Sequence, residues 1–186
     1  GFYEVSLGLF ERFLNNYPVS EKSAQARLFI SQCYFHQHRY LDALNQLERL
    51  DSMPDSKAIK DALWYWIGEV HFRGNSFSKA QEYYRKIINQ FPQSSYLAAS
   101  YYSLAWCYFK EHNYKEALVY FDEIEKKFTQ DSYADDARFK IVECFYSLKN
   151  YALAKEKANL YLKRYGSDKS RMSTLYFYIG ESDYYL

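Results

Sequence analysis

Residues 64–92 carry the sequence WYWIGEVHFRGNSFSKAQEYYRKIINQFP. Residues expected in a core recur three and four positions apart on both sides of the polar turn at 74–76. They are Trp64, Ile67 and His71 before the turn, and Ala80 and Tyr84 after it. This spacing is typical of two amphipathic helices. Because the turn between them is short, we expect the two helices to form an antiparallel hairpin.

The hairpin pattern recurs every 37 residues along the chain. An alanine marks the interval at Ala43, Ala80, Ala117 and Ala154, and an aromatic residue lies three positions before each alanine, at Tyr40, Phe77, Tyr114 and Tyr151. A fixed interval of this length indicates a repeat protein in which each unit is one hairpin. We therefore expect an all-α fold without strands. The expected helices span 2–16, 22–37, 40–51, 57–73, 77–90, 95–110, 114–127, 132–148, 151–164 and 170–186.

The interval also predicts the organisation of the chain, as a single solenoid fragment over 1–186. Its units are a half-unit at 1–18, full units at about 20–56, 57–93, 94–130 and 131–167, and a half-unit at 168–186. The last helix carries many apolar and aromatic residues, where a terminal repeat would normally present a polar face. This favours either a native chain that continues beyond Leu186 or end-to-end self-association through 170–186.

The second full unit resembles the tetratricopeptide family. Trp64, Ile67, Gly68 and His71, followed by Ala80, Tyr84 and Pro92, match in order and spacing its pattern W-x2-L-G-x2-Y, A-x3-F and P, with Ile for Leu and His for Tyr as departures. Later units depart further, at Thr129 and Gly166 in the proline position. The resemblance covers the whole chain and implies a right-handed α-solenoid of antiparallel helix pairs. It also implies a non-catalytic scaffold that binds a protein or peptide.

Two intervals are similar to the bacterial envelope branch of this family, which includes the Tol–Pal coordinating protein and the barrel-assembly lipoprotein. They are Asn16-Tyr17-Pro18 and Phe91-Pro92-Gln93-Ser94-Ser95-Tyr96. The resemblance favours a bacterial periplasmic or outer-membrane location, with the cytoplasm as the alternative.

Composition excludes some classes of function. The 24 basic and 23 acidic residues nearly cancel, so no net field attracts the chain to nucleic acid or to an anionic membrane. No apolar run is long enough for a transmembrane segment. In contrast, 22 tyrosines and 14 phenylalanines provide more ring surface than a core of this size requires.

No cofactor, metal or catalytic site is expected. Cys33, Cys107 and Cys144 share one position of the repeat, which predicts buried free thiols that are too far apart for a disulfide. His71 occupies a tyrosine position and is expected in the core, whereas His36, His38 and His112 fall at helix ends. No histidine pairs with Cys, Asp or Glu at metal-ligand spacing, and no phosphate-binding or nucleophile motif is present.

The aromatic residues of the first helices are the candidate binding site. In the family, the first helix of each unit lines a concave face. The matching positions here are Leu28, Tyr65, Trp66, Glu69, Tyr102, Trp106, Phe139, Lys140 and Tyr176. A second row, Phe35, Phe72, Phe109 and Tyr146, lies either in the groove or between the helices. Rigid rings of this kind can hold a peptide helix or an extended proline-rich segment.

The family's carboxylate-clamp sites use Lys, Arg and Asn on the groove helices, and Lys140 is the one basic residue among the matching positions here. The sequence therefore favours an apolar or aromatic peptide over a C-terminal carboxylate. Two alternatives stay open: the solenoid is a structural arm of a larger enzyme, such as a cell-wall hydrolase, or it assembles with copies of itself.

Overall fold

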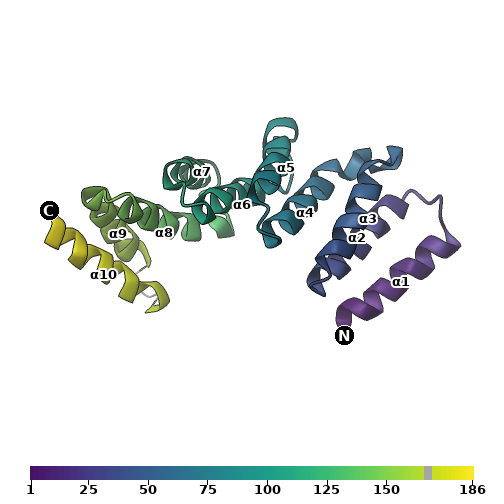
Figure 1. The fold of residues 1–186 in the computed structure, drawn as a ribbon, viewed down its shortest axis with the longest axis horizontal. Helices are drawn as coiled ribbons and strands as arrows, with labels where there is room; N and C mark the ends of the chain where they lie inside the picture. Colours follow the sequence, from purple (N-terminus) through teal and green to yellow (C-terminus); the bar gives the residue numbers. More distant parts are fainter. Residues whose placement is uncertain (166–168) are drawn as a thin grey trace. The chain divides into compact units, whose positions relative to one another are not determined.

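The computed structural model describes residues 1–165 and 169–186, and within these residues all regular secondary structure is helical. The helices, labelled in Figure 1, are α1 (Phe2–Asn16), α2 (Ser23–His36), α3 (Tyr40–Asp51), α4 (Lys60–Arg73), α5 (Phe77–Gln90), α6 (Leu97–Lys110), α7 (Tyr114–Lys127), α8 (Ser132–Ser147), α9 (Tyr151–Tyr165) and α10 (Lys169–Tyr185), with a short 3-10 helix η1 (Pro54–Ile59) before α4. The all-α prediction is confirmed. Most helix ends lie within two residues of the expected ones.

The chain divides into two compact units, Gly1–Ser100 and Tyr101–Leu186, each with its own core. In the first unit, α1 packs on α2, α2 pairs with α3, and α4 pairs with α5 (Figure 1). Ala43 and Ala80, the recurring alanines of this unit, are fully buried, because a small side chain lets neighbouring helices approach closely.

In the second unit, α7 packs on α8, α8 on α9 and α9 on α10. Phe139, Val142, Ala158, Tyr161 and Leu175 form a buried cluster there. Ala117 and Ala154 are again fully buried. Each unit therefore uses the repeated alanine in the same way.

Every hairpin turn has the same backbone geometry. His38, Asn75, His112 and Lys149, which are 37 residues apart, have φ angles of 61, 56, 59 and 58°. After each of them, one amide reaches back to the carbonyl five residues earlier, as from Arg39 to Tyr34 at 2.9 Å and from Asn150 to Phe145 at 2.9 Å. These bonds define a Schellman motif, whose left-handed residue is usually glycine. Here a residue with a side chain takes that conformation in every turn.

The cysteine and histidine predictions are confirmed. Cys33, Cys107 and Cys144 are buried free thiols, and burial raises the pKa of the Cys144 thiol to about 12. His71 is buried against the ring of Tyr83, at a centroid distance of 6.0 Å. Burial also lowers the pKa of His71, as expected for an imidazole kept neutral in a core.

Candidate functional site

In the first unit, the predicted site residues of α4 pack against their neighbours. Trp66 contacts Phe35 edge-on at 5.2 Å and His36 at 5.7 Å between ring centroids. The ring of Tyr65 lies 4.9 Å from that of Tyr96. Phe35 is buried, Tyr65, Trp66 and Tyr96 are partly exposed, and His36 is exposed. The rings of α4 therefore contribute to a partly exposed aromatic surface whose members hold one another in place.

Glu69 has a structural partner. Its Oε1 accepts a hydrogen bond of 2.8 Å from the hydroxyl of Tyr84, and the Tyr84 side chain is fully buried. A carboxylate that satisfies a buried hydroxyl stabilises the hairpin. Glu69 therefore serves the packing of α4 on α5, although the sequence placed it among the binding residues.

In the second unit, Tyr102 of α6 begins a polar chain that links three first helices. Its hydroxyl donates to Asp136 Oδ2 at 2.6 Å, and Asp136 Oδ1 accepts from Arg171 Nη2 at 2.6 Å. Burial and the hydrogen bond to Asp136 raise the pKa of the Tyr102 hydroxyl. The Tyr102 ring lies 4.7 Å from Tyr133. Tyr102 is thus held rigidly and connects α6 to α8.

Next to this chain lies a group that we call the Trp106 cluster: Tyr102, Trp106 and Phe109 of α6 with Lys140 of α8. The Lys140 ammonium lies 4.5 Å from the Trp106 ring centroid and 5.1 Å from that of Phe109, and the two rings meet edge-on at 5.4 Å. Distances below about 6 Å are typical of cation–π contact. All four side chains remain partly exposed, so part of this aromatic surface is accessible to solvent.

The charge of Lys140 is neutralised within the cluster's surroundings. Its ammonium forms an ion pair with Glu143, and Glu143 Oε1 also accepts from the Tyr178 hydroxyl at 3.5 Å. Lys140 thus already has a carboxylate partner, whereas Lys110, whose ammonium lies 5.5 Å from the Trp106 ring centroid, forms no ion pair within the described residues.

Two of the nine predicted positions are in the core. Leu28, on α2, is buried in the hydrophobic core of the first unit. Phe139 is covered by Arg171, whose guanidinium lies 4.9 Å from the ring, and by Tyr161 at 5.9 Å. These two side chains do not present a surface to a partner. Tyr176, in contrast, is 58% exposed on α10.

The second aromatic row packs within the hairpins. Each of its rings contacts edge-on the aromatic residue that opens the second helix of the same hairpin, in the pairs Phe35–Tyr40, Phe72–Phe77, Phe109–Tyr114 and Tyr146–Tyr151, at 5.4, 5.6, 5.3 and 6.1 Å. Such pairs stabilise the turn between the two helices. Of the two alternatives for this row, packing between helices is the one observed in all four pairs.

Sequence reasoning missed the polar residues between the first helices. Asp136, Glu143 and Arg171 link α8 to its neighbours. The position of Asp136 holds Ala62 and Ala99 in the preceding units, so the repeat contained no signal for it, whereas the position of Glu143 holds Glu69 in the second full unit. In the described part of the chain, no group of three or more His, Cys, Asp or Glu side chains is arranged to hold a metal ion. None of the described helices is long and apolar enough to cross a membrane.

Comparison with known proteins supports the tetratricopeptide fold. The family model described as anaphase-promoting complex, cyclosome, subunit 3 matches residues 48–124. A tetratricopeptide repeat protein from Parabacteroides merdae superposes with a TM-score of 0.74 at 15% identity, covering 94% of this chain and 66% of that one. The C-terminal part of a repeat protein from Cytophaga hutchinsonii gives 0.73 at 17% identity, covering 97% and 65%.

A third structure, YrrB, is described as a tetratricopeptide protein with an unusual peptide-binding site. It superposes with a TM-score of 0.72 at 14% identity and covers 95% of this chain and 82% of that one. No curated protein matches the sequence significantly. The chain thus has the tetratricopeptide-repeat fold, and it spans slightly under two thirds of the Parabacteroides and Cytophaga structures.

Proposed function

We propose that this chain is a non-catalytic scaffold that binds a peptide segment of a partner protein against the Trp106 cluster. The observation that carries the proposal is the partly exposed Trp106 ring, held between Lys140 at 4.5 Å and Phe109 at 5.4 Å. Rigid aromatic side chains at a surface lose little entropy on binding and are typical anchors of interfaces.

The chemistry of the cluster favours an apolar or proline-containing peptide. Lys140 is paired with Glu143, and Lys110, whose ammonium lies 5.5 Å from the Trp106 ring centroid, is exposed to solvent, so the surface between them is mainly aromatic. Proline and aliphatic side chains pack well on indole and phenyl faces. YrrB, a chain with the same fold, is described as having an unusual peptide-binding site, which supports a peptide as the ligand.

The indole N–H signals of the three tryptophans allow a direct test by NMR. Peptides selected from a random library on the wild-type chain are titrated into labelled protein, with each indole assigned from a Trp→Phe variant. We expect the Trp106 signal to shift and Trp106→Ala to weaken binding by about tenfold or more. Leu41→Ser, which removes an exposed apolar side chain of α3, is the control. Shifts at Trp64 or Trp66 alone, or undiminished binding by Trp106→Ala, would contradict the proposal.

Self-association through 170–186 is a second candidate, favoured by one observation. Tyr176, Phe177, Tyr184 and Leu186 are all more than half exposed on or next to α10, and clustered exposed apolar side chains are typical of interfaces. Sedimentation velocity over a range of concentrations tests it: a monomer throughout, unchanged by Phe177→Ser, is the contradicting result. The periplasmic or outer-membrane location and the role as an arm of a larger enzyme remain predictions from the resemblance.

A further inference from the structure

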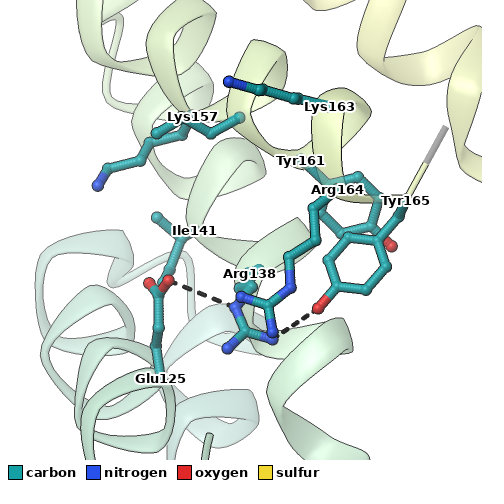
Figure 2. Close-up of a pocket in the computed structure, with 9 residues that line it drawn as sticks. Glu125, Arg138, Ile141, Lys157, Tyr161, Lys163, Arg164 and Tyr165 are labelled. Atoms are coloured by element: carbon teal, nitrogen blue, oxygen red, sulfur yellow. Dashed lines mark hydrogen bonds and ion pairs between the residues drawn. The ribbon is translucent and has the colours of Figure 1, made fainter.

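A groove runs between the second helices α7 and α9, with α8 as its floor. Its deeper part is a pocket of about 470 Å³, shown in Figure 2, whose walls include Glu125, Arg138, Ile141, Lys157, Leu160 and Arg164. A shallower hollow of about 280 Å³ continues it and shares Ile141 and Lys157. The groove uses other residues of α8 than the Trp106 cluster does.

The groove exists because one repeat position holds a lysine, Lys157, in place of an aromatic residue. Residues 37 positions apart occupy equivalent places, and the position of Lys157 holds Tyr83 and Tyr120 in the preceding hairpins. Tyr120 stacks on Tyr108 at 5.5 Å with nearly parallel planes, and Tyr83 stacks on His71 at 6.0 Å. At the third such place, Phe145 faces Lys157 across the shallower hollow. A lysine cannot fill the space of a stacked ring, so the groove is open here.

The first unit provides an internal comparison. There the same position holds Gln46, which also lines a hollow, of about 400 Å³, together with Arg27 at the position of Arg138. Both hairpins in which this position lacks an aromatic ring thus have a hollow beside it. The hollows differ in polarity, because the position of Leu160 is occupied in the first unit by Arg49.

Exposed apolar side chains distinguish the α7–α9 groove. Leu160 is 53% exposed and lines the deeper pocket, and Val119 is 54% exposed and lines the shallower hollow. In the other hairpins, the position of Leu160 holds Arg49, Lys86 and Glu123, and that of Val119 holds Asn45, Glu82 and Glu156. Solvent-facing apolar residues that replace charged and polar ones on both walls of one groove indicate a contact surface.

The groove also carries unneutralised positive charge. Its acidic residues are occupied, since Glu125 pairs with Arg138 at 3.4 Å and Asp122 pairs with Lys126. Within the described residues, Lys157, Lys163 and Arg164 have no ion-pair partner, and the Arg164 guanidinium lies 5.4 Å from the Tyr165 ring centroid. Figure 2 shows Lys157 and Lys163 extending on one side of the pocket. Three such cations beside an apolar wall complement a ligand that is both acidic and apolar.

Arg138 forms a fixed part of the wall. Its guanidinium donates to Asp135 at 2.9 Å and to the Tyr165 hydroxyl at 2.7 Å, as well as contacting Glu125 (Figure 2). Because these contacts hold α7, α8 and the end of α9 together, the groove is formed in advance. A preformed groove lowers the entropic cost of binding.

We propose that this groove binds an acidic peptide segment of a partner protein. An apolar side chain of the peptide lies between Leu160 and Val119, and flanking carboxylates pair with Lys157, Lys163 and Arg164. The site is distinct from the Trp106 cluster in position and in the chemistry of its ligand, so each proposal can fail while the other holds.

Three matched peptides test the chemistry: acetyl-Asp-Glu-Leu-Leu-Asp-Glu-amide, its Asn-Gln-Leu-Leu-Asn-Gln analogue without charge, and its Asp-Glu-Ser-Ser-Asp-Glu analogue without apolar side chains. Each is titrated into the labelled full chain and followed by NMR. We expect the first peptide to bind best, to shift signals of α8 and α9, and to bind about tenfold more weakly when salt rises from about 50 to about 500 mM. Equal binding of the uncharged peptide, or no binding of the first, would overturn the proposal.

Variants then locate the site. Lys157→Tyr introduces the residue of the two preceding hairpins and fills the groove against Phe145. We expect the melting temperature to be unchanged or raised and peptide binding to weaken by about tenfold or more. Lys163→Glu should weaken binding to a similar extent without filling the groove. Lys115→Glu changes an exposed lysine of α7 outside the groove and should leave binding unchanged. Binding that survives both Lys157→Tyr and Lys163→Glu would overturn the proposal.

Discussion

Gly68 lies directly against the ring of Tyr84: a Cβ at Gly68 would come within 2.6 Å of Tyr84 Cε1. The same two repeat positions are buried in every full hairpin, where they hold Ser31 with Leu47, Ala105 with Phe121, and Val142 with Ala158. Gly68, the smallest residue at the first position, is paired with Tyr84, the largest at the second, and Val142, the largest at the first position, is paired with Ala158, the smallest at the second. The hairpins therefore keep the combined volume of the pair and vary its members, as close packing requires.

Gly68→Ala should lower the free energy of unfolding by about 1–3 kcal/mol, because the added methyl overpacks the buried site. The Tyr84 ring cannot easily move away, because the Tyr84 hydroxyl donates a hydrogen bond of 2.8 Å to Glu69. Combining Gly68→Ala with Tyr84→Phe copies the pair Ala105–Phe121 and frees the ring. We expect the double variant to be more stable than the sum of the single effects, as measured by urea unfolding. Strict additivity would show that the two sites are not coupled.

Lys149→Gly should raise the free energy of unfolding by about 1 kcal/mol, because a φ of 58° strains a residue that has a Cβ. Lys149→Ala keeps the Cβ and controls for loss of the lysine side chain. Lys149→Val should be destabilising, since a branched side chain tolerates this backbone conformation least. Thermal unfolding of the three variants measures the order Gly, Ala, Val. If Lys149→Gly were no more stable than Lys149→Ala, the backbone at residue 149 would not be strained by the presence of a Cβ.

Tyr102→Phe should destabilise the chain by about 1.5 kcal/mol near neutral pH, because it removes the hydrogen bond to Asp136. The pKa of Tyr102 is raised in the folded state by burial and by Asp136. Its stabilising effect is therefore complete below the ordinary tyrosine pKa of about 10 and is lost as the pH rises above that value.

The stability difference between wild type and Tyr102→Phe should accordingly shrink above about pH 10, since the phenylalanine has no proton to lose. Urea unfolding of both proteins between about pH 8 and about pH 11 measures this difference. Titration of other groups is common to the two proteins and cancels. A difference that stays constant over this range would mean that Tyr102 has the same pKa in the folded and unfolded chain.

Cys144 should react slowly with iodoacetamide in the native chain. Burial raises its pKa to about 12, and the thiolate is the reactive form. The thiolate fraction at neutral pH is then lower by roughly a thousandfold than for a free cysteine. Mass spectrometry after timed labelling, with and without denaturant, provides the measurement. Rapid native labelling at Cys144 would indicate that the thiol is exposed.

The helices and core columns could be predicted from the sequence because the 37-residue interval repeats the apolar pattern of each hairpin. The main error in helix bounds is at α4, expected from 57 but beginning at Lys60, because Pro54 starts a 3-10 helix in the linker. The candidate site was predicted less well. Trp106 and Lys140 do form a partly exposed cluster, but Leu28 and Phe139 are buried. Exposure at these positions depends on which side chain of the next helix covers them.

The sequence by itself determined the all-helical repeat and the burial of one cysteine column, since both follow from periodic spacing along the chain. It also contained the cause of the α7–α9 groove, a lysine where two preceding hairpins have tyrosine. The tertiary structure was needed to show that Leu160 and Val119 line one groove with three cations that have no ion-pair partner among the described residues, and that Arg171 covers Phe139. Those outcomes depend on packing and charge pairing between helices, and spacing along one helix carries no information about them.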